Sequence, residues 1–329
     1  MSDFSGSSRF MASPGERVFF GTIKEHRAPM DIVTHGMMGV VIAAPFMADY
    51  PEASIAFMMG SVAPDLDAMS RIAGRRRFLK FHQTYSHAFP VIAAIAAAAY
   101  VVSAALGFPG LHVALGLALG MCFHSVLDFS NTYGITLLAP FSNRRFCREW
   151  VFFIDLPVIA VTVGALYVLY SELARAKMPG LELSYGYMAF LVAYWMVRIV
   201  LRRRAGRLAP EGTASLLPTT FVPWKFIGAR PLDGEVHLFD LSAVHGRLSR
   251  ESLQKIHDGP YATILEAIPE YQAMRALSPL YQVVRVQKDE QNVTLTCRDL
   301  RTRNFDTRFG ELLVTLGSGG TVQAVELNV

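Results

Sequence analysis

Four apolar segments, each close to the length that crosses a bilayer, constrain the fold of this chain more than any other feature. The hydrocarbon core of a bilayer requires about 20 apolar residues in a helix. Only 18% of the 329 residues are charged, below the roughly 25% of typical soluble domains. These charges are sparse from about residue 30 to 200 and frequent from 202 onward. The four segments, which predict a membrane helical bundle, are residues 88–107, 111–130, 151–171 and 185–201.

Two shorter apolar segments precede these four. GMMGVVIAAPFMA (36–48) and ASIAFMMGSVAP (53–64) flank DYPE, which has a charge at either end. Neither is long enough to span a bilayer, so we expect a short re-entrant pair or two buried helices. Irregular backbone at that depth is tolerated only inside protein or beside a wet cavity. LGFPGLH (106–112) predicts a tight turn and therefore a helical hairpin between two long segments.

Lys and Arg residues gather on one side of the predicted bundle. Positively charged loops stay on the cytoplasmic side of a membrane, so we expect this side to face the cytoplasm. On the opposite side, LGFPGLH contains no Lys or Arg, and ELARAKMPG contains two. Because the chain leaves its last span on the basic side, the C-terminal region is expected to be cytoplasmic as well. The basic residues are Arg71, Arg75, Arg76, Arg77 and Lys80; Arg144, Arg145 and Arg148; and Arg202, Arg203, Arg204 and Arg207.

Changes in composition divide the chain into three parts. Residues 1–29 form a polar N-terminal tail without the apolar core of a signal peptide. Residues 30–207 are the membrane-embedded part, and residues 208–329 predict a smaller soluble α+β region. The fold class is therefore a mainly α membrane helical bundle, with about four full spans and a short helix pair, followed by this C-terminal region.

The C-terminal region contains short segments rich in Val, Leu and Thr. YQVVRVQ, NVTLTCR, ELLVTLG and TVQAVELN predict four strands of an antiparallel meander. SRESLQKIHDG and ATILEAIPEYQAMRAL predict helices. The three cysteines, Cys122, Cys147 and Cys297, have no paired spacing, so they indicate neither a disulfide framework nor a zinc ribbon.

Side chains that can bind metal ions fall at one face of the predicted bundle. His124 and Asp128 stand four residues apart in an apolar segment, and residues at that spacing share one face of a helix. Ionisable residues within a span are costly and usually mark a functional site. The predicted topology places the whole set at the cytoplasmic ends of the helices. The candidate metal ligands are His35, Asp65, Asp67, His82, His87, His124, Asp128 and Asp155.

The chemistry of this set indicates a divalent transition metal. Imidazole nitrogen combined with carboxylate oxygen suits Zn²⁺, Mn²⁺ or Fe²⁺. Ca²⁺ and Mg²⁺ prefer all-oxygen shells, so neither alone fits. We expect Zn²⁺ first, and two ions, because the set exceeds the needs of one. Such a pair activates water and clamps a phosphoryl group, with Asp67 as a ligand or the general base.

Each candidate residue also has a simpler explanation. A single His at a membrane interface is more often a hydrogen-bonded polar residue than a metal ligand. Asp65 and Asp67 can terminate a helix, and Asp155 can cap the N-terminus of the third span, where the helix dipole favours a carboxylate. Asp128 is the hardest to explain in this way. The argument for a site therefore depends on the set as a whole.

Several of these motifs resemble one known family. DIVTHGMMG, GSVAPDLD, FHQTYSHAF, FHSVLDFSNTYGITLLAPFSN and WVFFIDLP follow one another over roughly residues 30–160. They resemble the YdjM-like family of bacterial inner-membrane proteins, which is classed as metal-dependent hydrolases and described as LexA-binding. SLLPTTFVPWKF resembles the downstream Pro/Trp segment of that family. The resemblance implies a multi-pass inner-membrane protein and singles out the same eight His and Asp residues.

One departure from the family pattern concerns a substrate contact. Gln83 and Thr84 stand where the family usually has Arg-Gly, so a contact to a substrate phosphate is expected to be weaker. The order of the His and Asp residues is also similar to that of zinc phospholipase C and related single-strand nucleases, which hydrolyse phosphoesters.

The first hypothesis is a membrane-bound metal-dependent hydrolase. It would activate water against a phosphoester or another ester, with a lipid-like substrate reaching the site from the bilayer and Arg75 to Arg77 attracting its headgroup. The alternative is a non-catalytic, membrane-anchored regulatory protein that binds a LexA-type partner through the C-terminal region. A transporter is disfavoured because the acids gather at one face and not at the midplane. There is no direct signal for nucleic-acid binding, and the substrate and oligomeric state are not identified.

Overall fold

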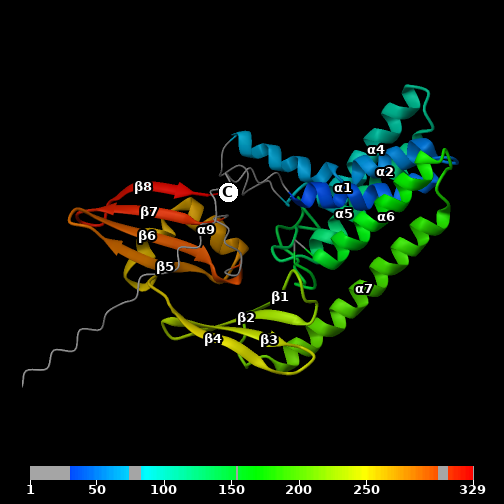
Figure 1. Ribbon diagram of the computed structural model, residues 1–329. Helices are drawn as coiled ribbons and strands as arrows, with labels where there is room; N and C mark the ends of the chain where they lie inside the picture. The colour runs from blue at the N-terminus through cyan, green and yellow to red at the C-terminus, as the bar shows by residue number, and fades with distance from the viewer. Residues whose placement is uncertain (1–29, 74–82, 153–154, 303–309, 329) are drawn as a thin grey trace, which may run out of the picture.

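The computed structural model describes residues 30–73, 83–152, 155–302 and 310–328, and it consists of a helical part followed by two β-sheets (Figure 1). The apolar segments form the helices, in agreement with the predicted fold class. The helical elements are α1 (Met30–Ala43), η1 (Ala44–Phe46), α2 (Pro51–Gly60), η2 (Ala63–Ala73), α4 (Phe89–Ala105), α5 (Gly110–Phe129), α6 (Leu156–Ala174) and α7 (Leu181–Leu208).

Three of the helices in the described residues are long and apolar enough to cross a membrane, namely α5, α6 and α7. The remaining predicted span, residues 88–107, forms α4, which has 17 residues and rises only about 26 Å. The prediction of four full spans is therefore confirmed for three. The helix of the third span also starts later than predicted, at Leu156, because Asp155 caps it and Pro157 follows in its first turn. Proline is favoured there because its missing N–H has no partner at a helix start.

Helix α5 lies against both α2 and α4, and three glycines allow the close approach to α2. A Cβ on Gly60 would collide with the carbonyl oxygen of Leu117 on α5. Cβ atoms on Gly116 and Gly120 would collide with backbone carbonyl oxygens on α2. Small residues four apart are a common device for close packing of membrane helices. This contact sets how deep the His and Asp side chains of α5 lie beside η2.

Helix α1 packs at the centre of a second group of helices, next to the contact between α2 and α5. It lies against α2, α6 and α7, and Met38 and Val41 pack with Leu127 of α5 and Leu191 of α7 in one apolar cluster. The Ser184 hydroxyl of α7 donates to a backbone carbonyl of α1, at 2.6 Å. Both short predicted segments are helical, as α1 with η1 and as α2, but only Ser54, Ala56 and Gly60 of α2 are buried.

The C-terminal region forms two four-stranded antiparallel sheets, with strand orders β1-β2-β3-β4 and β5-β6-β7-β8. The predicted meander of the last four strands is confirmed, and the two helices α8 (Ala262–Glu266) and α9 (Pro269–Leu277) match the prediction for ATILEAIPEYQAMRAL. The strands are β1 (Ser215–Pro218), β2 (Lys225–Leu232), β3 (Glu235–Ser242), β4 (Leu248–Lys255), β5 (Tyr281–Lys288), β6 (Asn292–Asp299), β7 (Leu312–Gly317) and β8 (Val322–Leu327).

The helix predicted for SRESLQKIHDG is wrong, because most of this segment is strand β4, paired antiparallel with β3. Nearly all of β4 is exposed, so it has no apolar face that burial could select. Hydrogen bonding to β3 therefore makes this segment a strand, although its local sequence favours a helix. Charged side chains on such an edge strand also discourage pairing with another chain.

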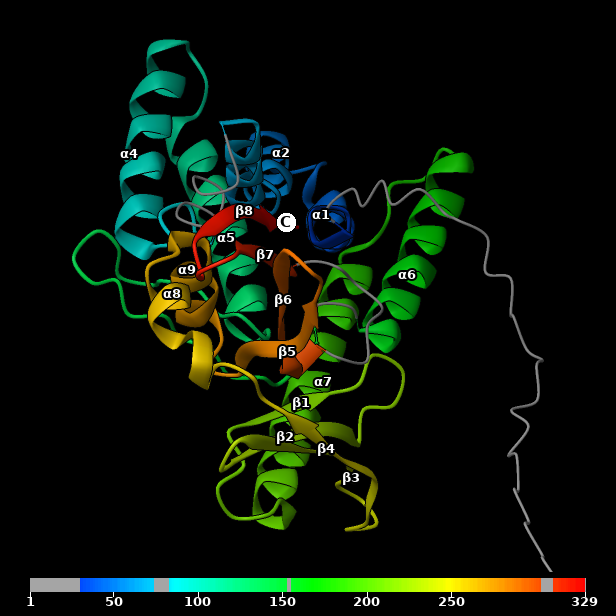
Figure 2. The same cartoon turned by 90° about the vertical axis from the view of Figure 1, so that its left-hand side faces the viewer.

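The first sheet is attached to the end of α7 (Figures 1 and 2). Ala205 and Leu201 of α7 pack against Phe226, Phe239 and Leu241 of this sheet. The predicted boundary near residue 208 falls at the last residue of α7. Helix α7 thus continues from the helical part into the core of the first sheet.

Candidate metal centre

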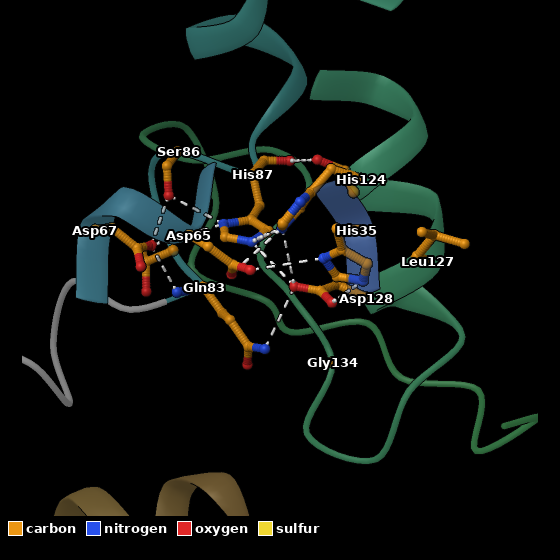
Figure 3. Close-up of polar contacts among 12 residues, drawn as sticks. His35, Asp65, Asp67, Gln83, Ser86, His87, His124, Leu127, Asp128 and Gly134 are labelled. Carbon is orange, nitrogen blue, oxygen red and sulfur yellow. Dashed lines mark hydrogen bonds and ion pairs between the residues drawn. The ribbon is translucent and has the colours of Figure 1, made fainter. Parts of the chain in front are cut away.

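Five of the predicted site residues converge at one end of the helical part (Figure 3). They come from four separate elements: His35 from α1, Asp65 from η2, His87 from the turn before α4, and His124 and Asp128 from α5. All five are buried, and His87 and His124 are 0% exposed. Buried ionisable groups need a partner or a metal ion, because water is not available to them.

Four of these residues are spaced as the ligands of one metal ion. One ligand atom from each of Asp65, His87, His124 and Asp128 lies within 4.8 Å of the others. The distance from His87 Nε2 is 3.0 Å to Asp128 Oδ2 and 3.1 Å to His124 Nε2. The distance from His124 Nε2 is 3.4 Å to Asp65 Oδ1 and 3.6 Å to Asp128 Oδ2. Tetrahedral Zn²⁺ with bonds of about 2.0–2.1 Å holds its ligand atoms about 3.3 Å apart, so the group fits such an ion.

The other ring nitrogen of each histidine has its own hydrogen-bond partner. His124 Nδ1 lies 2.9 Å from the carbonyl oxygen of Ser61, so it carries the proton and donates it. His87 Nδ1 lies 3.0 Å from Ser86 Oγ, and the Ser86 hydroxyl donates to Asp67 Oδ2 at 2.6 Å. Since that hydroxyl proton points to Asp67, His87 Nδ1–H is the donor to Ser86. Both Nε2 atoms are then free to bind a cation, which is the arrangement that partners behind metal-bound histidines enforce.

Asp67 lies behind His87 and not among the four grouped ligands. Its Oδ2 accepts from the backbone N–H of Gln83 at 2.9 Å, as well as from Ser86, and lies 3.7 Å from His87 Nδ1. The predicted role of Asp67 as ligand or general base stays a prediction. The geometry favours a third role, which is to orient His87.

His35 lies beside the four grouped ligands. Its Nδ1 is 3.6 Å from Asp65 Oδ2, and its Nε2 is 3.8 Å from Asp128 Oδ1. Within the described part of the chain, His35 Nδ1 and Asp65 Oδ2 are buried without a hydrogen-bond partner. Leaving such atoms unsatisfied costs about 1–3 kcal/mol each. A cation bound between them would satisfy both, so the donor set fits a metal ion on this side as well.

The ionisation of Asp65 agrees with this arrangement. Burial alone would raise the pKa of this carboxyl, but contacts with His124 and His35 outweigh it and hold the pKa well below its usual range. Asp65 is therefore anionic at neutral pH, as a metal ligand would be.

Asp155 is placed differently from the prediction that it completes the metal site. Its Oδ1 accepts from Val158 N–H at 3.3 Å, which caps α6, and from Tyr194 O–H at 2.8 Å. Its Oδ2 lies 3.6 Å from an Arg198 nitrogen. Burial raises the pKa of this carboxyl, although the Arg198 charge opposes that effect. Asp155 and His35 line one small cavity of about 50 Å³, but Asp155 is not part of the four-ligand group.

Two further predictions lie outside the described residues. His82, a predicted ligand, and Arg75 to Arg77, predicted to attract an anionic headgroup, fall in the segment 74–82.

Sequence reasoning did not predict the contacts that three side chains make with the candidate residues. Gln83 Nε2 donates to Asp128 Oδ2 at 3.4 Å, from a residue with φ of 56°. Arg145 donates to the Gly134 carbonyl at 3.1 Å and is close enough to Asp67 and Asp128 to interact with their charges. Arg198 could have been found from sequence, because it is a lone charge within the apolar run YWMVRIV.

One contact links the C-terminal region to the segment that follows α5. Arg301, which is 6% exposed, pairs with Asp299 through two nitrogens. It also donates to the carbonyl of Thr132 at 3.2 Å and lies over the Tyr133 ring at 5.1 Å. Thr132 and Tyr133 follow α5 only a few residues after Asp128. The C-terminal region therefore helps to hold the segment that leaves the site.

Comparison with known proteins agrees with the motifs. The chain is similar to the uncharacterized protein YfhP of Bacillus subtilis (strain 168), with 25% identity over 195 residues, which cover 55% of this chain and 58% of the relative. This chain thus spans less than two thirds of the length of that relative. No solved structure matches the chain described here. The family model of the YdjM inner membrane protein matches residues 30–205, more than half of the chain. With its membrane-capable helices and its grouped His and Asp residues, the chain belongs to the YdjM inner membrane protein family.

Proposed function

We propose that this protein is a membrane-bound hydrolase that depends on a divalent metal ion. The observation that carries the proposal is the buried group Asp65, His87, His124 and Asp128, in which one ligand atom from each residue lies within 4.8 Å of the others. Both histidines have their second nitrogen held by a hydrogen bond, which presents the first as a ligand. Zn²⁺ suits two imidazoles and two carboxylates best, with Mn²⁺ or Fe²⁺ as alternatives.

The four grouped residues would hold one ion, and His35 would complete the shell of a second. When bound, such ions lower the pKa of water towards neutrality and polarise an ester or phosphoester. The protein residues then have separate tasks. Ser61 and Ser86 hold the two imidazole rings, and the side-chain amide of Gln83 donates to Asp128.

The substrate class follows from position and charge. His124 and Asp128 lie in the last two turns of α5, a membrane-capable helix, so a substrate anchored in the bilayer could reach them. Arg145, whose charge interacts with those of Asp67 and Asp128, would favour an anionic ester such as a phosphoester. The basic clusters support a site and a C-terminal region on the cytoplasmic side.

Metal content tests the proposal directly. Wild type, His124→Ala and Asp128→Asn are purified in detergent, and bound metals are measured by mass spectrometry. His112→Ala is the matched control, because His112 lies at the opposite end of the same helix against Tyr50. We expect metal in wild type and in the control, and a large loss in both site variants. Full metal content in both site variants would overturn the proposal.

Activity separates the hydrolase from the alternative function. The metal-loaded protein is assayed against phospholipids, prenyl phosphates and chromogenic phosphodiesters. Hydrolysis by wild type and not by His124→Ala supports the enzyme. A metal-loaded protein that hydrolyses none of these classes would favour the alternative of a membrane-anchored binding protein.

A further inference from the structure

The contact between Asp155 and Arg198 places Arg198 of α7 at the level where α6 starts. Asp155 directly precedes α6, and its Oδ2 lies 3.6 Å from an Arg198 nitrogen on α7. Residues 199–208 of α7 therefore continue past the start of α6, by about 15 Å. This extension carries Arg202, Arg203, Arg204 and Arg207, which are costly in hydrocarbon and belong in water or headgroups.

The loop between β1 and β2, residues 219–224, lies at this same level. The carbonyl oxygen of Thr220 accepts from the N–H of Leu156, the first residue of α6, at 3.1 Å. The carbonyl oxygen of Pro223 accepts from Arg198 Nη1 at 2.8 Å. Both membrane-capable helices thus hold this loop at the boundary, although it belongs to the sheet region by sequence.

The loop exposes two large aromatic side chains. Phe221 is 71% exposed and Trp224 is 41% exposed, and Lys225 follows them at the surface. The backbone is fixed, because Thr219 N–H donates to the Lys225 carbonyl at 2.9 Å and the Thr219 hydroxyl donates to the Val222 carbonyl at 3.0 Å. Aromatic rings beside a basic residue are typical of the layer where lipid headgroups meet hydrocarbon.

A second loop repeats the arrangement at another helix. The N–H of Phe89, the first residue of α4, donates to the Leu137 carbonyl at 3.0 Å. The residues that follow include Leu138, 46% exposed, and Phe141, 84% exposed. Two helix starts are therefore each bound to a loop that exposes apolar side chains, which is expected if both loops contact the bilayer surface.

We propose that the loop 219–224 inserts Phe221 and Trp224 among the lipid headgroups and so anchors the first sheet to the membrane surface. The partner is the lipid bilayer itself. The proposal is independent of the metal site, since it requires only the position of the loop beside α6 and α7.

Fluorescence quenching by brominated lipids tests this anchor. In a variant carrying Trp150→Phe and Trp195→Phe, Trp224 is the remaining tryptophan, because the chain has 3. The protein is reconstituted in vesicles of phosphatidylethanolamine and phosphatidylglycerol, with or without phosphatidylcholine brominated near the headgroup. We expect these lipids to quench roughly half of the Trp224 emission and iodide in the water to quench little, as for interfacial aromatic residues.

Two further variants make the result decisive. In a background in which all 3 tryptophans are replaced by Phe, Phe221→Trp reports on the same loop and Leu253→Trp is the control. Leu253 is 58% exposed, but it lies on β4 at the outer edge of the first sheet. We expect lipid quenching for F221W and iodide quenching for L253W. If Trp224 and F221W both respond to the two quenchers as L253W does, the loop is in water and the proposal is wrong.

Discussion

His87 Nε2 and His124 Nε2 face each other at 3.1 Å, although the two residues are 37 positions apart in the chain. Each ring has its Nδ1 proton directed elsewhere, to Ser86 and to the Ser61 carbonyl. The two facing nitrogens then both present lone pairs, which repel each other unless a cation lies between them. A proton or a metal ion between the two nitrogens would remove this repulsion, and the carboxylates of Asp65 and Asp128 lie where they could complete the shell of a metal ion.

The variant Asp67→Asn distinguishes between two roles of Asp67, orienting His87 and acting as a general base. Because Asp67 holds Ser86 behind His87, we expect metal affinity to fall about 10- to 100-fold, as for other partners behind metal ligands. Ser86→Ala removes the same relay and is expected to produce a similar loss. Metal titration by calorimetry measures both. Unchanged metal affinity together with lost hydrolysis in Asp67→Asn would assign Asp67 as a general base instead.

Gly120→Ala tests whether the contact between α2 and α5 positions the site. A methyl group there meets the Phe57 carbonyl, so the helices must separate, and overpacking of this kind costs about 1–3 kcal/mol. The separation would draw His124 away from Ser61, and bound metal should decrease although every ligand is present. Gly164→Ala on α6 is the control, because its Cβ would meet no atom within 4 Å. Equal metal content and thermal stability in the two variants would contradict this role.

Asp155→Asn should affect stability more than metal binding. The substitution leaves the buried Arg198 guanidinium without its anionic partner, which typically costs 3–5 kcal/mol. We expect about 3 kcal/mol, because Arg198 keeps bonds to the carbonyls of Trp150 and Pro223. Denaturation in detergent measures this loss of stability. Glu172→Gln is the control, because Glu172 lies at the other end of α6 and forms ion pairs with the exposed side chains of Arg175 and Lys177. This substitution should cost less than about 1 kcal/mol. Loss of metal with unchanged stability in Asp155→Asn would restore Asp155 as a ligand.

Cys147 provides a pH-dependent test of the segment after α5. Although the residue as a whole is exposed, its thiol group is largely buried and lies 3.0 and 3.1 Å from the carbonyl oxygens of Asn131 and Thr132, to which it donates. Burial, aided by the charge of Glu149, raises the pKa of this thiol from its ordinary value of 9.0 to about 11. Since the thiolate is the reactive form, we expect alkylation at pH 8 up to about 100-fold slower than in the unfolded chain.

The sign of the pH effect follows from the raised pKa. The folded state favours the protonated thiol, so this contribution to stability is complete below pH 9 and is lost as the pH rises through about 11. Mass spectrometry of alkylated peptides between pH 7 and 11 follows the reaction, and the protein unfolded in denaturant is the control. Rapid native labelling of Cys147 at pH 8 would show that this thiol is free in solution.

Helical periodicity made part of the site predictable. His124 and Asp128 share a face of α5 because they are four residues apart, and their place in an apolar helix marked them as costly and therefore functional. The shortfall of α4 was not predictable, since apolar composition continues past Ala105 whereas the helix ends there. The strand β4 was missed because an exposed segment has no burial pattern to read.

The sequence by itself determined that this chain builds a membrane helical bundle with imidazoles and carboxylates near one end, because apolar length and residue spacing are local properties. Only the tertiary structure decided which of those groups share a centre. It brings Asp65 and His87 to His124, and it directs Asp155 to Arg198. Those choices depend on how closely α2 approaches α5 and where α6 starts beside α7, and packing between distant segments sets both.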